Sequence, residues 1–553
     1  MKVVIVGGVA GGASAAARLR RLDERAEIVV YERGEHVSFA NCGLPYHVGG
    51  VIPRRDALLL QTPHSLKARF NLDVRVRHEV VGIHPQARRI TVRNLATGEI
   101  LDDTYDALIL SPGARPIIPP LPGVQDSRVH TLRSIADMDR IMAAVDAGAT
   151  RAAVLGGGYI GVEMAENLAA RGLQVSLVEQ APQVLTFLDP DMAAFAHHAL
   201  RAHGVELRLG ERAAELQPMD TGLRVVLANG TSLEVDLLVL AVGVTPETQL
   251  ARDAGLKIGK TGGIVVDERM RTSDPFIFAV GDAVEVYHLV ARNRTRIPLA
   301  GPANRQGRIA ANVICGVDSR YGDTQGTGII KVFDTVCAAT GAPSFMLRAL
   351  GIPFRTVTIH AESHASYYPD SHPVHLKLLY STKDGTLLGA QACGKDGVDK
   401  RIDVLATAIR HNANVYDLED YELAYAPPFG SAKDPVNLAA FVAVNDLRGL
   451  APVVDVDGLD AELARGALVL DVRTDKERAK GAMGGAVGIP VDELRGRLGE
   501  LPRDRTIVVC CAVGKRAHVA QRILLQNGFR ALNLTGGYTS YAMAKAPTMA
   551  SSL

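Results

Sequence analysis

The sequence predicts an α/β protein made of several modules, and three observations support this prediction. The chain has 553 residues, which at about 150 residues per domain corresponds to three or four domains. Hydrophobic residues make up 47% and charged residues 22% of the chain, so each module can bury a core. Two separate stretches run from a short apolar strand through a glycine-rich turn into a helix, the repeating unit of a parallel sheet.

The charge balance and the N-terminal segment limit the classes of partner. Lys plus Arg (61) nearly equal Asp plus Glu (60), so no overall field would attract nucleic acid or an anionic membrane. The apolar run in MKVVIVGGVAGGAS is too short for a signal-peptide core or a membrane span. We therefore expect a cytoplasmic protein that binds neither nucleic acid nor membrane and holds anionic ligands in local pockets.

The first strand–turn–helix unit predicts a dinucleotide site at the N-terminus. Residues 2–6 (KVVIV) form a β-branched strand, GGVAGG follows, and ASAAARLRRL has a helical pattern. Glycine is needed because the backbone turns tightly and approaches a pyrophosphate, whose charge meets the helix N-terminus. The next strand, AEIVVYE, ends at Glu32, 20 positions after Gly12, where a carboxylate can bind ribose hydroxyls. Val9 stands in place of the central glycine.

The second unit predicts a second dinucleotide site in full GxGxxG register. Within RAAVLGGGYIGVEMAENLAARGLQVSLVE, the glycines are Gly156, Gly158 and Gly161, and the following strand ends at Glu179. An acidic residue there, followed by Gln180 with no Arg nearby, favours NADH, with NADPH as the alternative. Two dinucleotide sites in one chain are what a flavoprotein reduced by a nicotinamide requires.

The chain resembles the pyridine-nucleotide disulfide oxidoreductases, and further stretches support this resemblance. SPGARP (111–116) and TSDPFIFAVGDA (272–283) are similar to the family's other flavin-contacting segments, and Asp282 matches its ribityl-binding Asp. LAVGVTPET (240–248) resembles the end of the nicotinamide domain. The resemblance implies two Rossmann-like domains, one for FAD (1–115 and 248–325) and one for NAD(P)H (116–247), then an α+β dimerisation domain (326–447) and hence a homodimer.

The resemblance also implies the residues that contact the two cofactors, FAD and NADH. These are Gly7, Gly8, Ala10, Gly11, Gly12, Glu32, Arg33, Ala114 and Asp282 for the flavin, and Gly156, Gly158, Tyr159, Ile160, Gly161, Glu163, Glu179 and Gly243 for the nicotinamide. No metal site is expected.

The segment SFANCGLPYHVGG contains a single redox-cysteine candidate, Cys42. None of the chain's six cysteines forms a CxxC pair, and the next one after Cys42 is Cys315. A lone redox cysteine either pairs with an external thiol or cycles through sulfenic acid. The first alternative predicts a thiol-substrate reductase, and the second predicts an NADH oxidase or peroxidase.

SFANCGLPY is similar to the cysteine motif of the coenzyme A disulfide reductases, whose resting cysteine is a mixed disulfide with coenzyme A. HASYYPDSH and YELAYAPPFGSAKDPVN place Tyr367 and Tyr425 where that subfamily has tyrosines that reach the partner subunit's active site. Such hydroxyls can protonate a leaving thiolate. The match implies a coenzyme A pocket made of Ser14, Arg18, Arg21, Ser38, Asn41 and Lys433. Phe70 departs from the subfamily, which has a basic residue near this position.

Residues 455–553 resemble a rhodanese domain. The loop CAVGKR places Cys511 at the end of a strand, and its backbone N–H groups up to Arg516 can cup a sulfane sulfur or an anion above a helix N-terminus. Cys511 and Arg516 bracket one residue fewer than in a phosphatase loop, which leaves phosphatase action a distant alternative. Cys510 is expected to be a buried strand residue. Ala482 replaces a His that is usual before the proline.

The leading functional hypothesis is an enzyme that reduces coenzyme A disulfide, coenzyme A persulfide or polysulfide with NADH through Cys42. Cys511 would collect or present sulfane sulfur in this hypothesis. An NADH oxidase or peroxidase shares most of the motifs, and a non-enzymatic flavin redox sensor or sulfur carrier is the third alternative. The partners that the leading hypothesis implies are small thiols, disulfides or persulfides and a second copy of the chain.

Overall fold

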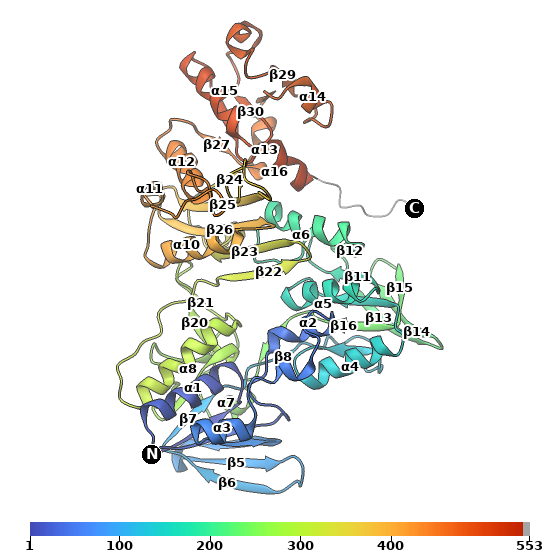
Figure 1. Cartoon of the computed structure of the whole chain (residues 1–553), viewed down its shortest axis with the longest axis vertical. Coiled ribbons are helices and arrows are strands. Elements are labelled where there is room, and N and C mark those ends of the chain that lie inside the picture. The colour runs from blue at the N-terminus through green and yellow to red at the C-terminus, as the bar shows by residue number, and fades with distance from the viewer. Residues whose placement is uncertain (546–553) are drawn as a thin grey trace. The chain divides into compact units, whose positions relative to one another are not determined.

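Both strand–turn–helix units form as predicted in the computed structural model, which describes residues 1–545, and each belongs to a parallel five-stranded sheet (Figure 1). The chain divides into two compact units. The first contains residues 1–180 and 204–324, and the second contains residues 181–203 and the chain from residue 325 onward. The predicted fold class, α/β with two Rossmann-like modules and two further modules, is confirmed.

The first sheet has the strand order β19-β7-β1-β2-β3. The middle of each central strand is apolar, as in other parallel sheets whose two faces are both covered. Val3, Val4 and Ile5 of β1 are fully buried. The elements of this part are β1 (Lys2–Val6), α1 (Ala10–Leu22), β2 (Glu27–Glu32), η1 (Asn41–Gly43), α2 (Leu44–Val48), η2 (Arg55–Leu58), α3 (Pro63–Phe70), β3 (Asp73–Val76), β4 (His78–His84), η3 (Pro85–Ala87), β5 (Arg89–Asn94), β6 (Ile100–Thr104), β7 (Ala107–Leu110) and β8 (Ala114–Pro116).

The chain returns to the first sheet after residue 243. The returning elements are β17 (Val244–Pro246), α7 (Gln249–Asp253), β18 (Ile264–Val265), β19 (Ile277–Ala279), η4 (Gly281–Ala283), β20 (Val284–Tyr287), β21 (Arg294–Thr295) and α8 (Ala300–Ile314). β17 pairs with β8, and β19 pairs with β7 at the edge of the sheet. Two segments far apart in the sequence therefore build one module.

The second sheet has the order β12-β11-β10-β16-β9, again parallel. Its module contains β9 (Val129–Thr131), α4 (Ile135–Asp146), β10 (Arg151–Leu155), α5 (Tyr159–Ala170), β11 (Gln174–Glu179), β12 (Glu206–Leu209), β13 (Ala213–Met219), β14 (Gly222–Leu227), β15 (Ser232–Val235) and β16 (Leu237–Leu240). The strands β13, β14 and β15 form a small antiparallel sheet.

The second unit contains an antiparallel sheet of order β22-β23-β26-β25-β24. Its elements are α6 (Pro190–Ala202), β22 (Gly328–Val332), β23 (Thr335–Gly341), α9 (Ser344–Ala349), β24 (Phe354–Glu362), β25 (Pro373–Ser381), β26 (Leu387–Gly394), α10 (Val398–Arg410), α11 (Val415–Glu419) and α12 (Pro435–Leu447). Helix α6 lies inside the predicted nicotinamide domain in sequence, yet it packs on β22, β23 and β26.

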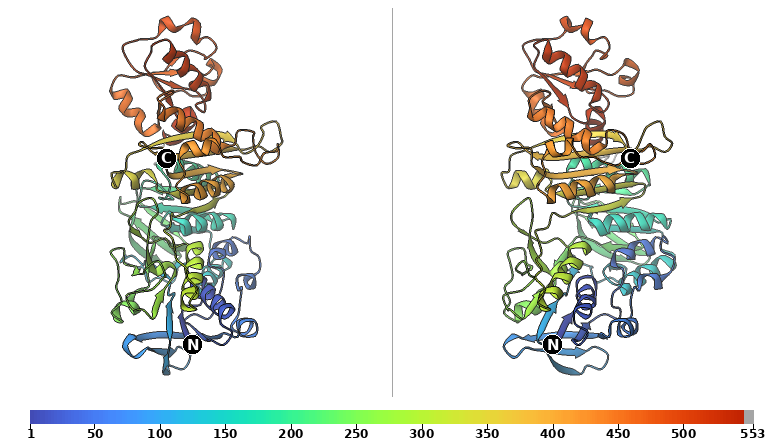
Figure 2. Two further views of the ribbon diagram at one scale, coloured as in Figure 1. Left: turned by 90° about the vertical axis from the view of Figure 1, so that its left-hand side faces the viewer. Right: turned by 60° about the vertical axis from the view of Figure 1, so that its left-hand side comes forward.

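The last part of the chain forms a small parallel sheet of order β27-β31-β30-β28-β29, drawn in orange to red in Figure 2. Its elements are β27 (Val453–Val454), α13 (Val456–Ala464), β28 (Leu468–Asp471), α14 (Asp475–Arg478), β29 (Val487–Gly488), η5 (Leu494–Gly496), η6 (Leu498–Glu500), β30 (Ile507–Cys510), α15 (Lys515–Gln526), β31 (Ala531–Leu534) and α16 (Gly537–Lys545). The part of the chain that the structure describes contains no helix long and apolar enough to cross a membrane.

Candidate redox site

The first glycine turn has the backbone that a bound pyrophosphate requires. Gly7 has a φ of +95°, and a Cβ added there would lie 2.1 Å from the Ser111 carbonyl oxygen. A Cβ at Gly12 would lie 1.9 Å from the Gly7 carbonyl oxygen, so only glycine lets α1 start this close to β1. The Gly8 N–H donates to Glu32 Oε2 at 2.9 Å, which places the carboxylate at the end of β2 beside the turn.

Asp282 supplies a second feature that fits a flavin. It lies in η4, and burial raises the pKa of its carboxyl, with Arg133 as the opposing positive charge. A buried carboxylate of this kind is stabilised by hydroxyl donors, and the ribityl chain of FAD carries such hydroxyls. Of the other predicted flavin residues, Ala10 has a φ of +37°, Arg33 pairs with Glu247 at 2.9 Å, Ala114 begins β8, and Gly11 is buried.

The second glycine turn fits a nicotinamide dinucleotide. Gly156 has a φ of +108°, and a Cβ at Gly161 would lie 1.8 Å from the Gly156 carbonyl oxygen. A Cβ at Gly158, by contrast, would have no atom within 4 Å, so the backbone at the start of α5 is open to an approaching phosphate. The Gly157 N–H donates to Glu179 Oε2 at 2.6 Å, which orients the predicted ribose-binding carboxylate.

The remaining predicted nicotinamide residues lie at the start of α5 and after β16. Tyr159 is the first residue of α5. Burial raises the pKa of its hydroxyl, and the negative charge of Glu163 raises it further. Ile160 is exposed, and Gly243 has a φ of +120° between β16 and β17. Glu163 is mostly buried one turn further along, and this burial raises the pKa of its carboxyl to about 7.

Cys42 stands between the two dinucleotide motifs. It lies in the short 3-10 helix η1, directly before α2. All six cysteines of the chain are free thiols. The residue is exposed at one side, yet burial of its sulfur raises the pKa, and the carboxylates of Glu163 and Asp282 raise it further. Burial and the two carboxylates therefore favour the thiol form of Cys42 over the thiolate.

The predicted coenzyme A residues lie on three segments. Ser14, Arg18 and Arg21 follow one another on α1 at helical spacing. Ser14 Oγ donates to Asn304 and Arg18 Nε donates to Asn312 Oδ1 at 2.8 Å, while Arg21 is exposed. Ser38, with a φ of +47°, donates its N–H to the Gly8 carbonyl oxygen, and Asn41 is exposed beside Cys42. Lys433, in the second unit, is exposed before α12.

The structure brings the two predicted tyrosines together. The hydroxyl oxygens of Tyr367 and Tyr425 are 3.3 Å apart, although 58 positions separate the residues in the sequence. Both side chains are exposed, to 75% and 49%, and the contact with Tyr425 raises the pKa of Tyr367. Two exposed aromatic side chains of one protomer that share a hydrogen bond are typical of a surface that meets a partner.

Cys511 lies in the loop that was predicted to hold sulfane sulfur. It follows β30, it is 1% exposed, and its carbonyl oxygen accepts the Tyr538 N–H at 2.8 Å. Helix α15 begins at Lys515 directly after Gly514, which has a φ of +90°. The prediction that Cys510 is a buried strand residue is confirmed, since it ends β30 and is fully buried.

Arg516 is held by a residue that the sequence alone did not single out. Its Nη1 donates to Glu477 Oε2 at 2.9 Å, and this hydrogen bond lowers the pKa of Glu477 to about 2. Glu477 also closes a capping box with Thr474 at the start of α14. The Thr-x-x-Glu pattern marks the cap in the sequence, but the pairing with Arg516 requires the fold.

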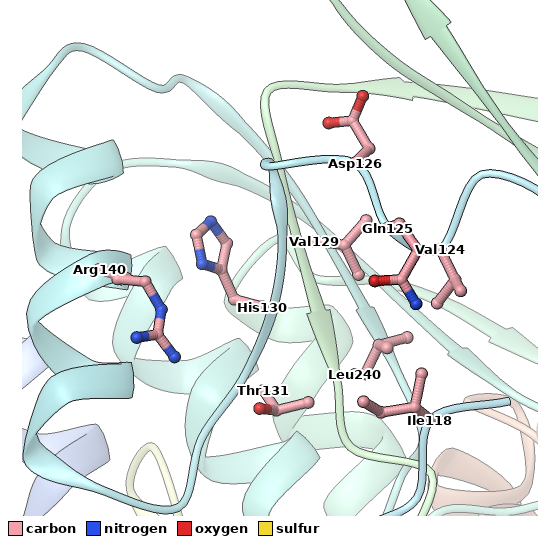
Figure 3. A pocket seen from close by; sticks show the side chains of 9 residues that line it. All are labelled: Ile118, Val124, Gln125, Asp126, Val129, His130, Thr131, Arg140 and Leu240. Atoms are coloured by element: carbon pink, nitrogen blue, oxygen red, sulfur yellow. The ribbon is translucent and has the colours of Figure 1, made fainter. Parts of the chain in front are cut away.

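A small pocket lies at the edge of the second sheet, away from these residues. It has a volume of about 160 Å³, and His130, Arg140, Asp126 and Leu240 are among its lining side chains (Figure 3). Burial lowers the pKa of His130, and the positive charge of Arg140 lowers it further. None of the predicted site residues lines this pocket.

Comparison with known proteins places each module. The pyridine nucleotide-disulphide oxidoreductase model matches residues 1–307, its dimerisation-domain model matches 328–435, and the rhodanese-like domain model matches 455–544. The coenzyme A disulfide reductase of Staphylococcus aureus strain JH9 is 34% identical over 444 residues, which cover 80% of this chain and 99% of that protein.

Two solved structures cover nearly the whole chain. The crystal structure of reduced Bacillus anthracis CoADR-RHD is 48% identical, with a TM-score of 0.96 and 98% of each chain covered. The structure of a NAD-dependent persulfide reductase from A. fulgidus is 38% identical, with a TM-score of 0.93, and covers 98% of this chain and 100% of that chain.

Proposed function

Because this chain belongs to the pyridine nucleotide-disulphide oxidoreductase family, we propose that it is an FAD-dependent reductase that uses NADH to cleave a sulfur–sulfur bond at Cys42. Its substrates are coenzyme A disulfide, coenzyme A persulfide or polysulfide. The similarity to a coenzyme A disulfide reductase and to a NAD-dependent persulfide reductase, over most of the chain, supports this substrate class.

The position of Cys42 carries the proposal. Its thiol lies within electrostatic reach of Asp282 in the first module and of Glu163 on the glycine-motif helix of the second. Bound FAD supplies a two-electron carrier between nicotinamide and sulfur, and Gly7, Gly12, Glu32 and Asp282 are the residues that hold it. Because all six cysteines are free, the sulfur that pairs with Cys42 comes from a substrate thiol.

The helix α1 and the tyrosine pair complete the site in this proposal. Arg18 and Arg21 bind the phosphates of coenzyme A, and Ser14, Ser38, Asn41 and Lys433 contact the rest of the molecule. Tyr367 and Tyr425 act in the partner subunit's site of a homodimer, where their hydroxyls protonate the departing thiolate. Their mutual hydrogen bond and their exposure in one protomer support this assignment.

Cys511 contributes to the same reaction by holding the sulfane sulfur that Cys42 reduces. A persulfide on Cys511 is cradled by the backbone of residues 512–516 and by the positive charge of Arg516. The rhodanese-like module thus collects the sulfur that Cys42 reduces to sulfide.

Anaerobic NADH consumption by the FAD-loaded protein tests the proposal. We expect turnover with coenzyme A disulfide, coenzyme A persulfide or polysulfide, with sulfide released from the last two and all turnover lost in Cys42→Ser. Cys511→Ser should keep coenzyme A disulfide reduction but lose sulfur transfer from thiosulfate, whereas Cys510→Ala, the matched control, should keep both. Turnover that starts only when oxygen is admitted would overturn the proposal in favour of an NADH oxidase.

A further inference from the structure

The segment that carries Cys42 is attached to helix α5 at three successive turns. Tyr46 Oη donates to Glu163 Oε1 at 3.3 Å. Gly49 packs against Asn167 so closely that a Cβ would lie 2.0 Å from Asn167 Oδ1, and Arg171 Nη1 donates to the Val48 carbonyl oxygen at 3.1 Å. Positions 163, 167 and 171 share one face of α5, because side chains four residues apart lie above one another. The helix of the second glycine motif thus holds the redox cysteine segment.

Among these three residues, Glu163 is the one whose charge acts on Cys42. The titratable groups that act on it or that it acts on are Tyr46 on α2, Cys42 on η1, and Tyr159 and Glu166 on its own helix. None of these groups carries a positive charge. The Glu163 carboxylate raises the pKa of the Cys42 thiol, so the two groups compete for protons.

We propose that Glu163 and Tyr46 form a proton-holding pair for Cys42, with Tyr46 as the positioning residue that orients the Glu163 carboxyl. Glu163 is protonated while Cys42 is a thiolate, and it is ionised while the sulfur is in a disulfide. This inference rests on the reductase function proposed above and deepens it, because it assigns the source of a proton that the reaction consumes. Glu163 can be protonated near pH 7, because burial raises the pKa of its carboxyl to about 7.

The stoichiometry of the proposed reaction requires such a group. Reduction of one disulfide to two thiols takes two electrons and two protons, of which NADH supplies both electrons and one proton. The Cys42 thiolate attacks the substrate disulfide, one S–S bond breaks as another forms, and a substrate thiolate leaves. A tyrosine hydroxyl of the site protonates that thiolate, the proton on Glu163 then replaces the one that the tyrosine lost, and Glu163 regains a proton from water when the disulfide on Cys42 is reduced.

The pH dependence of Cys42 alkylation tests the pair without any turnover. The FAD-loaded protein is reduced with a phosphine and treated with iodoacetamide from pH 6 to 9.5, and labelling of the Cys42 peptide is followed by mass spectrometry. Glu163→Gln removes the competing charge, so we expect the Cys42 profile to move to lower pH and labelling at pH 7.5 to rise about tenfold, the effect of one pKa unit. Tyr46→Phe should raise it less, and Glu163→Asp should restore the original profile.

Arg171→Gln is the matched control, because it loosens the same two segments at the far end of the face without touching Glu163. Its alkylation profile is expected to equal that of the unchanged protein, and FAD absorbance confirms that each variant is folded. An unaltered profile in Glu163→Gln would overturn the proton-holding pair. Because labelling needs neither NADH nor an acceptor, that result would leave the reductase proposal standing.

Discussion

Lys377 is a buried lysine that attaches helix α6 to the antiparallel sheet. It is 2% exposed on β25, and its Nζ lies 2.9 Å from Asp189 Oδ2 and 2.8 Å from Asp191 Oδ1. Burial alone lowers the pKa of Lys377, but the two carboxylates outweigh it and raise the pKa. Asp189 and Asp191 lie at the start of α6, so this cluster attaches α6 to the antiparallel sheet.

We expect Lys377→Met to destabilise the second unit strongly. Removal of the ammonium leaves two buried carboxylates without a counter-charge, and breaking a buried ion pair in this way costs about 3 to 5 kcal/mol. Calorimetry of the full chain measures the effect as a lower unfolding temperature. Lys383→Met, at an exposed lysine on the same hairpin, should change the free energy of unfolding by only about 0.5 kcal/mol. Equal unfolding temperatures in the two variants would contradict this account.

At the scale of elements, a histidine pair joins β24 and β25 to α6 and α16. The Nδ1 atoms of His360 and His375 are 2.7 Å apart, so one ring donates to the other and the accepting ring must be neutral. His360 Nε2 lies 2.9 Å from Ser540 Oγ, and the His375 ring stacks on Phe195 with centroids 4.1 Å apart. Burial lowers the pKa of His360 to about 3 and that of His375 to about 4.

This junction should weaken in acid. Above the unfolded pKa of about 6.5 the two rings are neutral in the folded and in the unfolded chain, so burying them costs no proton there and the free energy of unfolding is not reduced. As the pH falls from about 6.5 towards 4, only the unfolded chain gains protons, and each buried histidine then costs about 2 kcal/mol at pH 5. We expect His375→Gln to reduce, without abolishing, the difference in unfolding temperature between pH 7.5 and pH 5, because the buried His360 and His197 still contribute. The exposed His411→Gln should keep the whole difference, and a His375→Gln variant that also kept it would refute the pair.

At the scale of the whole molecule, the proposed site needs two copies of the chain. A dimerisation-domain model matches residues 328–435, and Tyr367 and Tyr425 lie within that range. Cys42 belongs to the first unit and the tyrosine pair to the second. If the tyrosines serve the partner's cysteine, loss of Cys42 in one protomer and of the tyrosines in the other damages the same site twice and leaves the second site intact.

Subunit complementation tests this arrangement. Cys42→Ser and the double variant Tyr367→Phe, Tyr425→Phe are each expected to lose most coenzyme A disulfide reductase activity as homodimers. When equal amounts are co-expressed, half of the dimers are mixed and each has one intact site, so about a quarter of the sites of the unchanged protein should return. No recovery, with mixed dimers present by mass spectrometry, would show that each cysteine works with tyrosines of its own chain.

Much of the fold and part of the site could be predicted from local patterns. The two turns could be predicted because a Cβ would collide with backbone at Gly7, Gly12, Gly156 and Gly161. Only glycine fits there, so the residue type alone indicates the turn. The single Cys42 and the Cys511 loop were equally visible, because a reactive thiol between a strand and a helix has a recognisable context. Tyr46, Glu477 and the buried histidines were not visible, since their partners are 39 or more positions away or depend on how sheets pack.

The sequence by itself determined the strand–turn–helix units, the two dinucleotide motifs and the candidate cysteines, because these depend on backbone sterics and on hydrophobic periodicity over short stretches. Only the tertiary structure decided that α6 joins the antiparallel sheet through Lys377, and that Glu163 and Asp282 both raise the pKa of Cys42. The physical reason is that burial and charge act through space, so a pKa or a buried ion pair depends on residues that folding brings together from distant parts of the chain.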